Sequence, residues 1–225
     1  MASEGLESRS FSFQAPVISA VAVGVLFVVA LAYVEFGPLS THMLGHITTM
    51  NILAPLLAAG LGARGWLGPA LASSAVLWSA SFIQMVLLWA WHGQDVQDFA
   101  HASTAITLLL HAGLLIAALA FWCAVIVSAA RPWQTILALL VSGKLACLLG
   151  ALLVFSPRLL IHVAGAGHAA PGDGAISDQH LAGLLMLAAC PLSYILAAIV
   201  LTARQISGLE QRHGAIRQDR SPIGG

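Results

Sequence analysis

Long apolar runs with almost no charged residues follow one another along this chain, and they leave few folds open to it. Each run is close to the roughly 20 residues that a helix needs to cross a bilayer. The period of two that marks a barrel strand is absent from the runs, so only helices can satisfy their backbone in lipid. The runs cover residues 16–34, 41–62, 70–91, 104–128, 133–155 and 180–203. The sequence therefore predicts an all-α fold, a polytopic transmembrane helical bundle of about six spans.

Composition excludes several classes of protein. Only 8% of the residues are charged and 59% are hydrophobic, whereas a soluble domain carries about a quarter charged residues. The expected surroundings are a lipid bilayer, and a formal net charge of zero argues against nucleic acid as a partner. We find no nucleophile–base pair, phosphate loop or HExxH motif, so we expect no enzyme. The three cysteines lie in different apolar runs without a CxxC pair, which predicts free thiols.

Arginines give the expected direction of the spans. Seven of them fall on the side that holds both termini, and the opposite side has only Arg158. The positive-inside rule then makes both termini cytoplasmic, in a multi-pass protein of a bacterial inner membrane. The expected domains are a cytoplasmic segment at 1–15, the bundle at 16–203 and a polar cytoplasmic tail at 204–225.

The first run has a second interpretation, as a signal peptide. Residues 30–32, Ala-Leu-Ala, resemble a cleavage site, but the preceding segment carries Glu4 and Glu7 rather than a clear positive charge. We therefore expect a retained anchor.

Histidines collect at one side of the predicted bundle. With the orientation above, eight of the nine fall in the outer half, and only His213 is cytoplasmic. The eight are His42, His46, His92, His101, His111, His162, His168 and His180. The orientation was set by arginines alone, so this gathering is an independent observation.

His42, His46 and Met50 follow one another at intervals of four, which places them on one face of a helix. The stripe is roughly 12 Å long, so one metal ion can bind either the two histidines or His46 with Met50. Imidazole and thioether together suit copper, especially Cu(I). His92, His111 and either Met43 or Met186 are candidates to complete the site. The alternative is that these side chains only pack or hydrogen-bond at the level of the lipid headgroups.

Other residues in or near the spans also have predicted roles, and for some of them two interpretations stay open. Lys144 lies mid-span, where a charge is costly and marks either a function or a side chain that reaches a polar gap. Asp178 is expected to cap the last span at its beginning. Asp95 and Asp98 belong to a solvated loop, or support a histidine ligand. Gly143 and Gly150 flank a face where two helices can approach closely.

Four stretches then resemble one family in order and spacing. They are "HMLGHITTMNILAPLLAAG", "WHGQDVQDFA", "HAGLLIAALAFW" and the pair "LGALLVFSPR" with "DQHLAGLLM". Together they cover about residues 38–203 and resemble the multi-span cytochrome c oxidase assembly factor family CtaG, of the caa3 type. The chain departs from the family pattern at Gly93, Thr107, Lys144 and His180, and it has six expected spans where relatives often have seven.

The resemblance implies assembly of a haem-copper cytochrome c oxidase by supporting copper insertion into an oxidase subunit, with a periplasmic copper donor as a further partner. The expected copper ligands are His42 and His46 first, then His92 and His111, with Met50. Three alternatives stay open: a haem-binding membrane electron carrier that uses His46 and His111, a channel or transporter, and a metal-free assembly scaffold.

Overall fold

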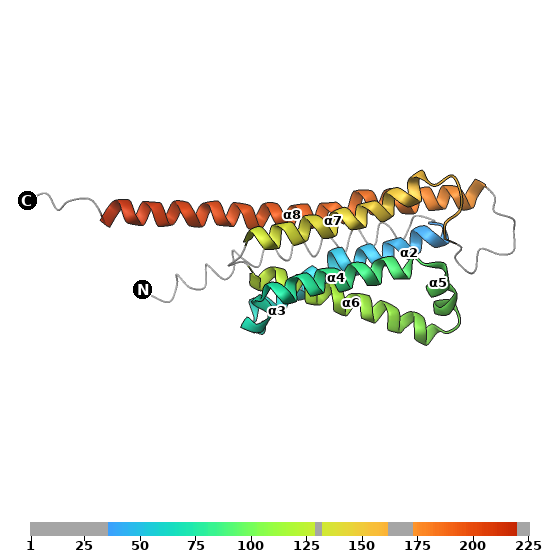
Figure 1. The fold of residues 1–225 in the computed structure, drawn as a ribbon, viewed down its shortest axis with the longest axis horizontal. Helices are drawn as coiled ribbons and strands as arrows, with labels where there is room; N and C mark the ends of the chain where they lie inside the picture. Colours follow the sequence, from blue (N-terminus) through green and yellow to red (C-terminus); the bar gives the residue numbers. More distant parts are fainter. Residues whose placement is uncertain (1–35, 129–131, 162–172, 220–225) are drawn as a thin grey trace, which may run out of the picture. The chain divides into compact units, whose positions relative to one another are not determined.

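The computed structural model describes residues 36–128, 132–161 and 173–219, and within these ranges it is a helical bundle without a strand (Figure 1). The all-α fold is therefore confirmed. The elements are α2 (Pro38–Ile47), η1 (Thr48–Leu53), α3 (Ala54–Ala63), η2 (Pro69–Ala72), α4 (Ser74–Trp91), α5 (Gln94–His101), α6 (Thr104–Val127), α7 (Pro132–Phe155) and α8 (Asp173–Asp219).

Five described helices are long and apolar enough to cross a membrane. They span Pro38–Ala63, Ser74–Trp91, Thr104–Val127, Pro132–Phe155 and Gly174–Ala203. They correspond to five of the six predicted runs, and the run at 16–34 lies outside the described residues. The bounds differ most at three places: a short 3₁₀ turn precedes α4, α8 begins at Asp173 rather than near residue 180, and α8 continues as a helix beyond residue 203 to Asp219.

The first described span is one continuous helix with an irregular middle. α2 passes into η1, which has π-helical hydrogen bonding, and η1 passes into α3 with helical dihedral angles at both junctions. Pro55 lies at the start of α3, where its ring has no N–H to donate to the carbonyl of Asn51 and would clash with it in a regular helix. A π-bulge is a usual response to such a break.

Neighbouring helices satisfy the polar groups of η1. The indole Nε1 of Trp122 donates to the Met50 carbonyl at 2.9 Å. The Asn51 side chain accepts from Ser193 Oγ at 2.7 Å, and its Nδ2 lies 3.6 Å from the Cys190 sulfur. These contacts tie the middle of the first span to α6 and α8, as is required where a helix is interrupted at membrane depth.

Asp178 caps a different helix from the one predicted. α8 begins at Asp173, so Asp178 lies inside that helix. Its carboxylate accepts the backbone N–H groups of Leu39, at 2.8 Å, and Ser40, at 3.2 Å, and also the Ser40 hydroxyl. Gly37, the residue before α2, provides no side-chain cap of its own. The prediction was wrong because the orphan N–H groups at the start of α2 are satisfied from α8 instead.

The adjacent residue ties the connection between α7 and α8 to the bundle. Gln179 is fully buried; its Nε2 donates to the carbonyls of Leu153 and Arg158, and its Oε1 accepts from the Leu160 N–H at 2.6 Å. The start of α8 is therefore fixed both to α2 and to the end of α7.

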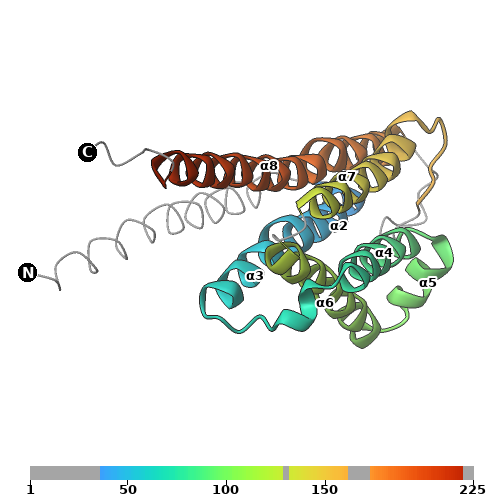
Figure 2. The ribbon, with the colours of Figure 1, turned by 60° about the vertical axis from the view of Figure 1, so that its left-hand side comes forward.

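Small residues let α7 and α8 pack closely. A Cβ added at Gly150 would lie 3.0 Å from the Gly183 carbonyl oxygen, which is tighter than most real contacts. The close approach expected at Gly150 is thus confirmed, with Gly183 as its partner. Figure 2 shows the two helices running side by side.

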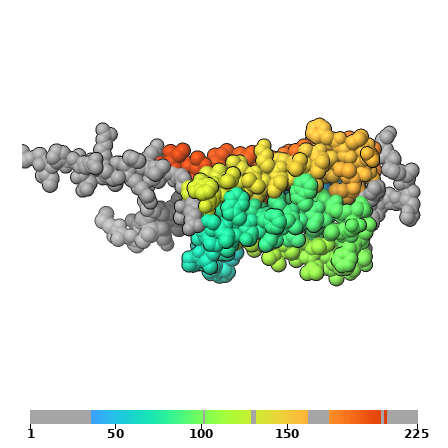
Figure 3. All heavy atoms as spheres, viewed as in Figure 1, coloured from blue at the N-terminus to red at the C-terminus, as the bar shows by residue number. Residues whose placement is uncertain are grey.

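The remaining helices complete the bundle. α4 packs against α6 and α7, α2 against α8, and α3 against α6 (Figure 2). On the face shown in Figure 3, α7 (yellow) runs above α4 (green), and little of the blue of α2 is visible. The segment between α4 and α6, expected as a loop, contains the short helix α5, which packs on α6. Lys144 is exposed near the midpoint of α7.

Candidate metal centre

His42 and His46 meet on the second half of α2. The interval of four residues puts the two rings one turn apart on the same face, as the sequence predicts. Their Nε2 atoms lie 2.9 Å apart, His46 is 1% exposed and His42 is half-buried. Two nitrogens that share one metal ion at about 2 Å each are roughly 3 Å apart. The pair is therefore already close to the spacing of two ligands.

His92 enters the same space from the end of α4. It is the C-cap residue of that helix, and its Nδ1 lies 2.6 Å from the Leu88 carbonyl oxygen. A carbonyl can only accept, so Nδ1 carries the proton and donates it. Metal-binding histidines are commonly oriented in this way, by a hydrogen bond from the ring nitrogen that does not bind the metal. The Nε2 atom is left to act as a ligand.

The Met43 sulfur lies opposite this nitrogen. Met43 is fully buried, and its Sδ is 3.1 Å from His92 Nε2. Burial lowers the pKa of His92 to about 4, although the hydrogen bond to Leu88 acts in the opposite direction. The imidazole is thus neutral at pH 7. Its Nε2 lone pair faces the lone pairs of a thioether with no proton between them, and a soft cation would complete this arrangement.

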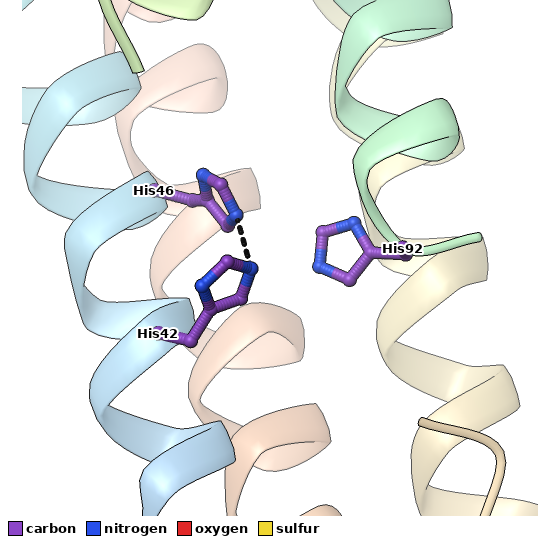
Figure 4. A group of neighbouring side chains, drawn as sticks. All are labelled: His42, His46 and His92. Carbon is purple, nitrogen blue, oxygen red and sulfur yellow. Dashed lines mark hydrogen bonds between the residues drawn. The ribbon is translucent and has the colours of Figure 1, made fainter. Parts of the chain in front are cut away.

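Three histidines form one group with metal-binding geometry. The ligand nitrogens of His42, His46 and His92 all lie within 4.8 Å of one another. Figure 4 shows the two α2 rings facing the His92 ring across the gap between the helices. A small rotation of the rings would bring the three nitrogens onto one ion. The structure thus brings together three of the four histidines predicted as ligands.

His111 lies beside this group rather than in it. Its ring centroid is 5.9 Å from that of His46 and 6.4 Å from that of His42. Its Nδ1 is 2.8 Å from the Thr107 carbonyl oxygen, one turn earlier on α6, and this contact leaves Nε2 as the ligand atom. Trp91 packs between these side chains, with ring centroids 4.4 Å from His111 and 4.9 Å from His46.

Met50 lies one turn beyond His46, in η1, and is buried. The contact found for it involves its backbone carbonyl and Trp122. Its role as a ligand stays a prediction. The buried Nδ1 of His46 has no hydrogen-bond partner within the described parts of the chain, so one nitrogen of that ring is unpaired.

Sequence reasoning missed two residues that shape the group. Gln97, on α5, is 1% exposed and its Nε2 lies 3.2 Å from His42 Nε2. Trp91 packs against three histidine rings. The interval of three between the charged Asp95 and Asp98 was a usable signal, because it puts both on one side of a short helix and leaves the uncharged Gln97 on another.

The donor set decides which metal the group suits. It combines imidazoles with a thioether, and no carboxylate or thiolate belongs to the three-residue group. Such ligands bring no negative charge with them. They suit a soft, low-charge ion such as Cu(I) better than Mg²⁺ or Ca²⁺, which prefer oxygen ligands.

Fold and site together describe a multi-pass helical membrane protein with a buried histidine group suited to a metal ion. Comparison with protein families adds a more specific assignment. The family model described as cytochrome c oxidase caa3 assembly factor (Caa3_CtaG) matches residues 7–207, and the chain belongs to that family. No curated protein and no solved structure gives a match.

Proposed function

We propose that this protein carries Cu(I) as cargo and supports its insertion into a subunit of a haem-copper cytochrome c oxidase. The family supplies the assembly role and makes an oxidase subunit the partner. The metal group supplies a site for the cargo, with His42, His46 and His92 as ligands. The role is one of delivery rather than catalysis.

The observation that carries the copper assignment is the contact between His92 and Met43. A neutral imidazole nitrogen and a thioether sulfur lie 3.1 Å apart, with the imidazole proton committed to the Leu88 carbonyl. Two lone-pair donors in a buried place repel each other unless a cation or proton lies between them. A soft cation removes that repulsion and gains two ligands.

Delivery also requires that the ion can leave. Met43 and His46 are buried, whereas His42 is half-buried, so His42 is the ligand most accessible to an incoming group. The His111 ring, with its centroid 5.9 Å from that of His46, lies close enough to serve as an alternative ligand during exchange. A periplasmic copper donor and the oxidase subunit would approach from the same side.

The orientation of the protein belongs to the same proposal. The distribution of arginines supports a cytoplasmic position for both termini, and the ends of the helices that hold the histidine group would then face the periplasm of a bacterial inner membrane. This is the side from which copper would reach the site without crossing the bilayer.

A single ion fits the site better than haem does. A haem bound by His46 and His111 would need a flat space between the two rings and around them. The Trp91 ring packs against both, at 4.9 Å and 4.4 Å, and fills part of that space.

Copper quantification on the purified protein tests the proposal. We expect stoichiometric copper in the wild type after Cu(I) loading, and loss of most of it in the His42→Ala/His46→Ala double variant. His180→Ala is the matched control: that histidine is half-buried on α8 and lies outside the three-residue group, so its variant keeps the copper. Unchanged copper in the double variant would contradict the proposal. Intact oxidase assembly by a copper-free variant would favour the metal-free scaffold.

A further inference from the structure

Gln97 is the polar side chain that α5 directs toward the metal group. It is 1% exposed, while Asp95 and Asp98 on the same short helix are exposed. Gln94, one turn earlier, donates to Asp98 on the outside of the helix at 3.0 Å. The two glutamines of α5 therefore differ in surroundings: Gln94 is half-buried and bonded to an exposed carboxylate, whereas Gln97 is buried beside the histidine group.

The Trp91 carbonyl fixes how the Gln97 amide is oriented. The Nε2 atom lies 2.9 Å from the Trp91 oxygen and 3.2 Å from His42 Nε2. A carbonyl oxygen only accepts, so the atom facing it is the NH₂ group and not the amide oxygen. The second hydrogen of the same NH₂ group is then directed at His42, whose Nε2 has to be the acceptor.

The orientation of Gln97 in turn decides the protons of both α2 histidines. If His42 Nε2 accepts, its proton is on Nδ1. In the metal-free protein, His46 Nε2, 2.9 Å away, then donates to the same nitrogen, and this ring has to change tautomer before its Nε2 can bind the metal. This leaves the lone pair of His46 on Nδ1, the buried nitrogen that has no partner within the described residues. One amide therefore sets two tautomers.

We propose that Gln97 is a positioning residue that sets the tautomers of His42 and His46 and competes with the metal ion for His42 Nε2. The inference rests on the proposed function and gives it a means of release. Copper binding at His42 displaces the Gln97 hydrogen bond, and copper departure restores it. The competition lowers the affinity for copper without adding a ligand, which is what a carrier needs to pass its cargo on.

The affinity of the full-length protein for Cu(I), measured by competition with a chromogenic Cu(I) chelator, tests this competition. Gln97→Leu removes the competing donor, and we expect copper to bind about 2- to 10-fold more tightly, the equivalent of one ordinary hydrogen bond. Gln94→Leu is the matched control and leaves the affinity unchanged, because the side-chain amide of this half-buried residue donates to the exposed Asp98. Equal or weaker binding by a folded Gln97→Leu protein overturns the inference.

Histidine ¹⁵N NMR spectra of the metal-free wild type give a test that needs no variant to fold. We expect His42 to show an unprotonated Nε2 and His46 a protonated Nε2. The opposite tautomer at His42 overturns the inference. Wild-type protein that binds no Cu(I) contradicts the proposed function instead, and the NMR result is independent of that outcome.

Discussion

His92 and Met43 show how single residues far apart in sequence become one chemical unit. They belong to different spans, and each is buried in the structure. The spacing of His42 and His46 could be interpreted from the sequence, because an interval of four fixes neighbours on a helix. The meeting of His92 with Met43 could not, because it depends on how α2 and α4 rotate about their axes. Gln97 escaped prediction because its contact with His42 depends on where α5 packs on the bundle.

A substitution that keeps the side-chain volume tests whether the Met43 sulfur binds copper. We expect Met43→Leu to weaken Cu(I) binding by about tenfold or more, the scale of effect that loss of even a supporting partner produces. The fold should tolerate this exchange, because Leu and Met are close in size. Chelator competition measures the affinity, and a variant that binds copper as tightly as the wild type would exclude the sulfur from the site.

Met186→Leu is the control for that experiment. Met186 is also buried, but it packs where α8 meets Gly150 of α7. We expect its copper affinity to equal that of the wild type.

At the scale of elements, periodicity and length predicted the helices but not their irregularities. The five described spans are uniform enough in hydrophobicity to be located from sequence. The proline at position 55 gave a reason to expect a break, yet not that the response would be a π-helical segment satisfied by Trp122. The cap on α2 could not be predicted either, because it comes from Asp178, which lies 139 positions after Leu39 in the sequence.

Removal of that cap should loosen the helix that carries the histidine pair. We expect Asp178→Ala to cost about 1–2 kcal/mol of stability, the usual range for loss of a helix cap, and to weaken copper binding as well. Thermal unfolding in lipid nanodiscs and chelator competition measure the two effects. Asp98→Ala, which changes an exposed carboxylate on α5, is the comparison and should alter neither. Unaltered stability of Asp178→Ala would show that α2 begins without help from α8.

At the scale of the whole molecule, the helices alone do not explain the position of the Lys144 charge. Lys144 is exposed near the middle of α7, about 18 Å from either end at 1.5 Å per residue. Within the five described spans, the one acidic residue is Asp178, which is engaged at the start of α2. A lysine at the centre of a bilayer costs about 2.5–3.5 kcal/mol on insertion scales.

Replacement of this lysine should therefore stabilise the isolated protein. We expect Lys144→Leu to raise the unfolding midpoint in nanodiscs and to leave copper affinity unchanged, because α7 contributes no ligand to the three-histidine group. Lys144→Arg keeps the charge and should behave like the wild type. A lower midpoint for Lys144→Leu would mean that the ammonium group makes a favourable contact at that depth.

The bond between Asp178 and the start of α2 has a consequence for biogenesis. During synthesis the first histidine pair leaves the ribosome well before the residue that anchors its helix, which lies 139 positions behind Leu39. A half-made chain in the translocon thus carries the histidine pair on a helix that still lacks its cap. The proposed copper site would reach its full affinity only after α8 has docked on α2, so that an incomplete polypeptide would compete less for the ion in the cell.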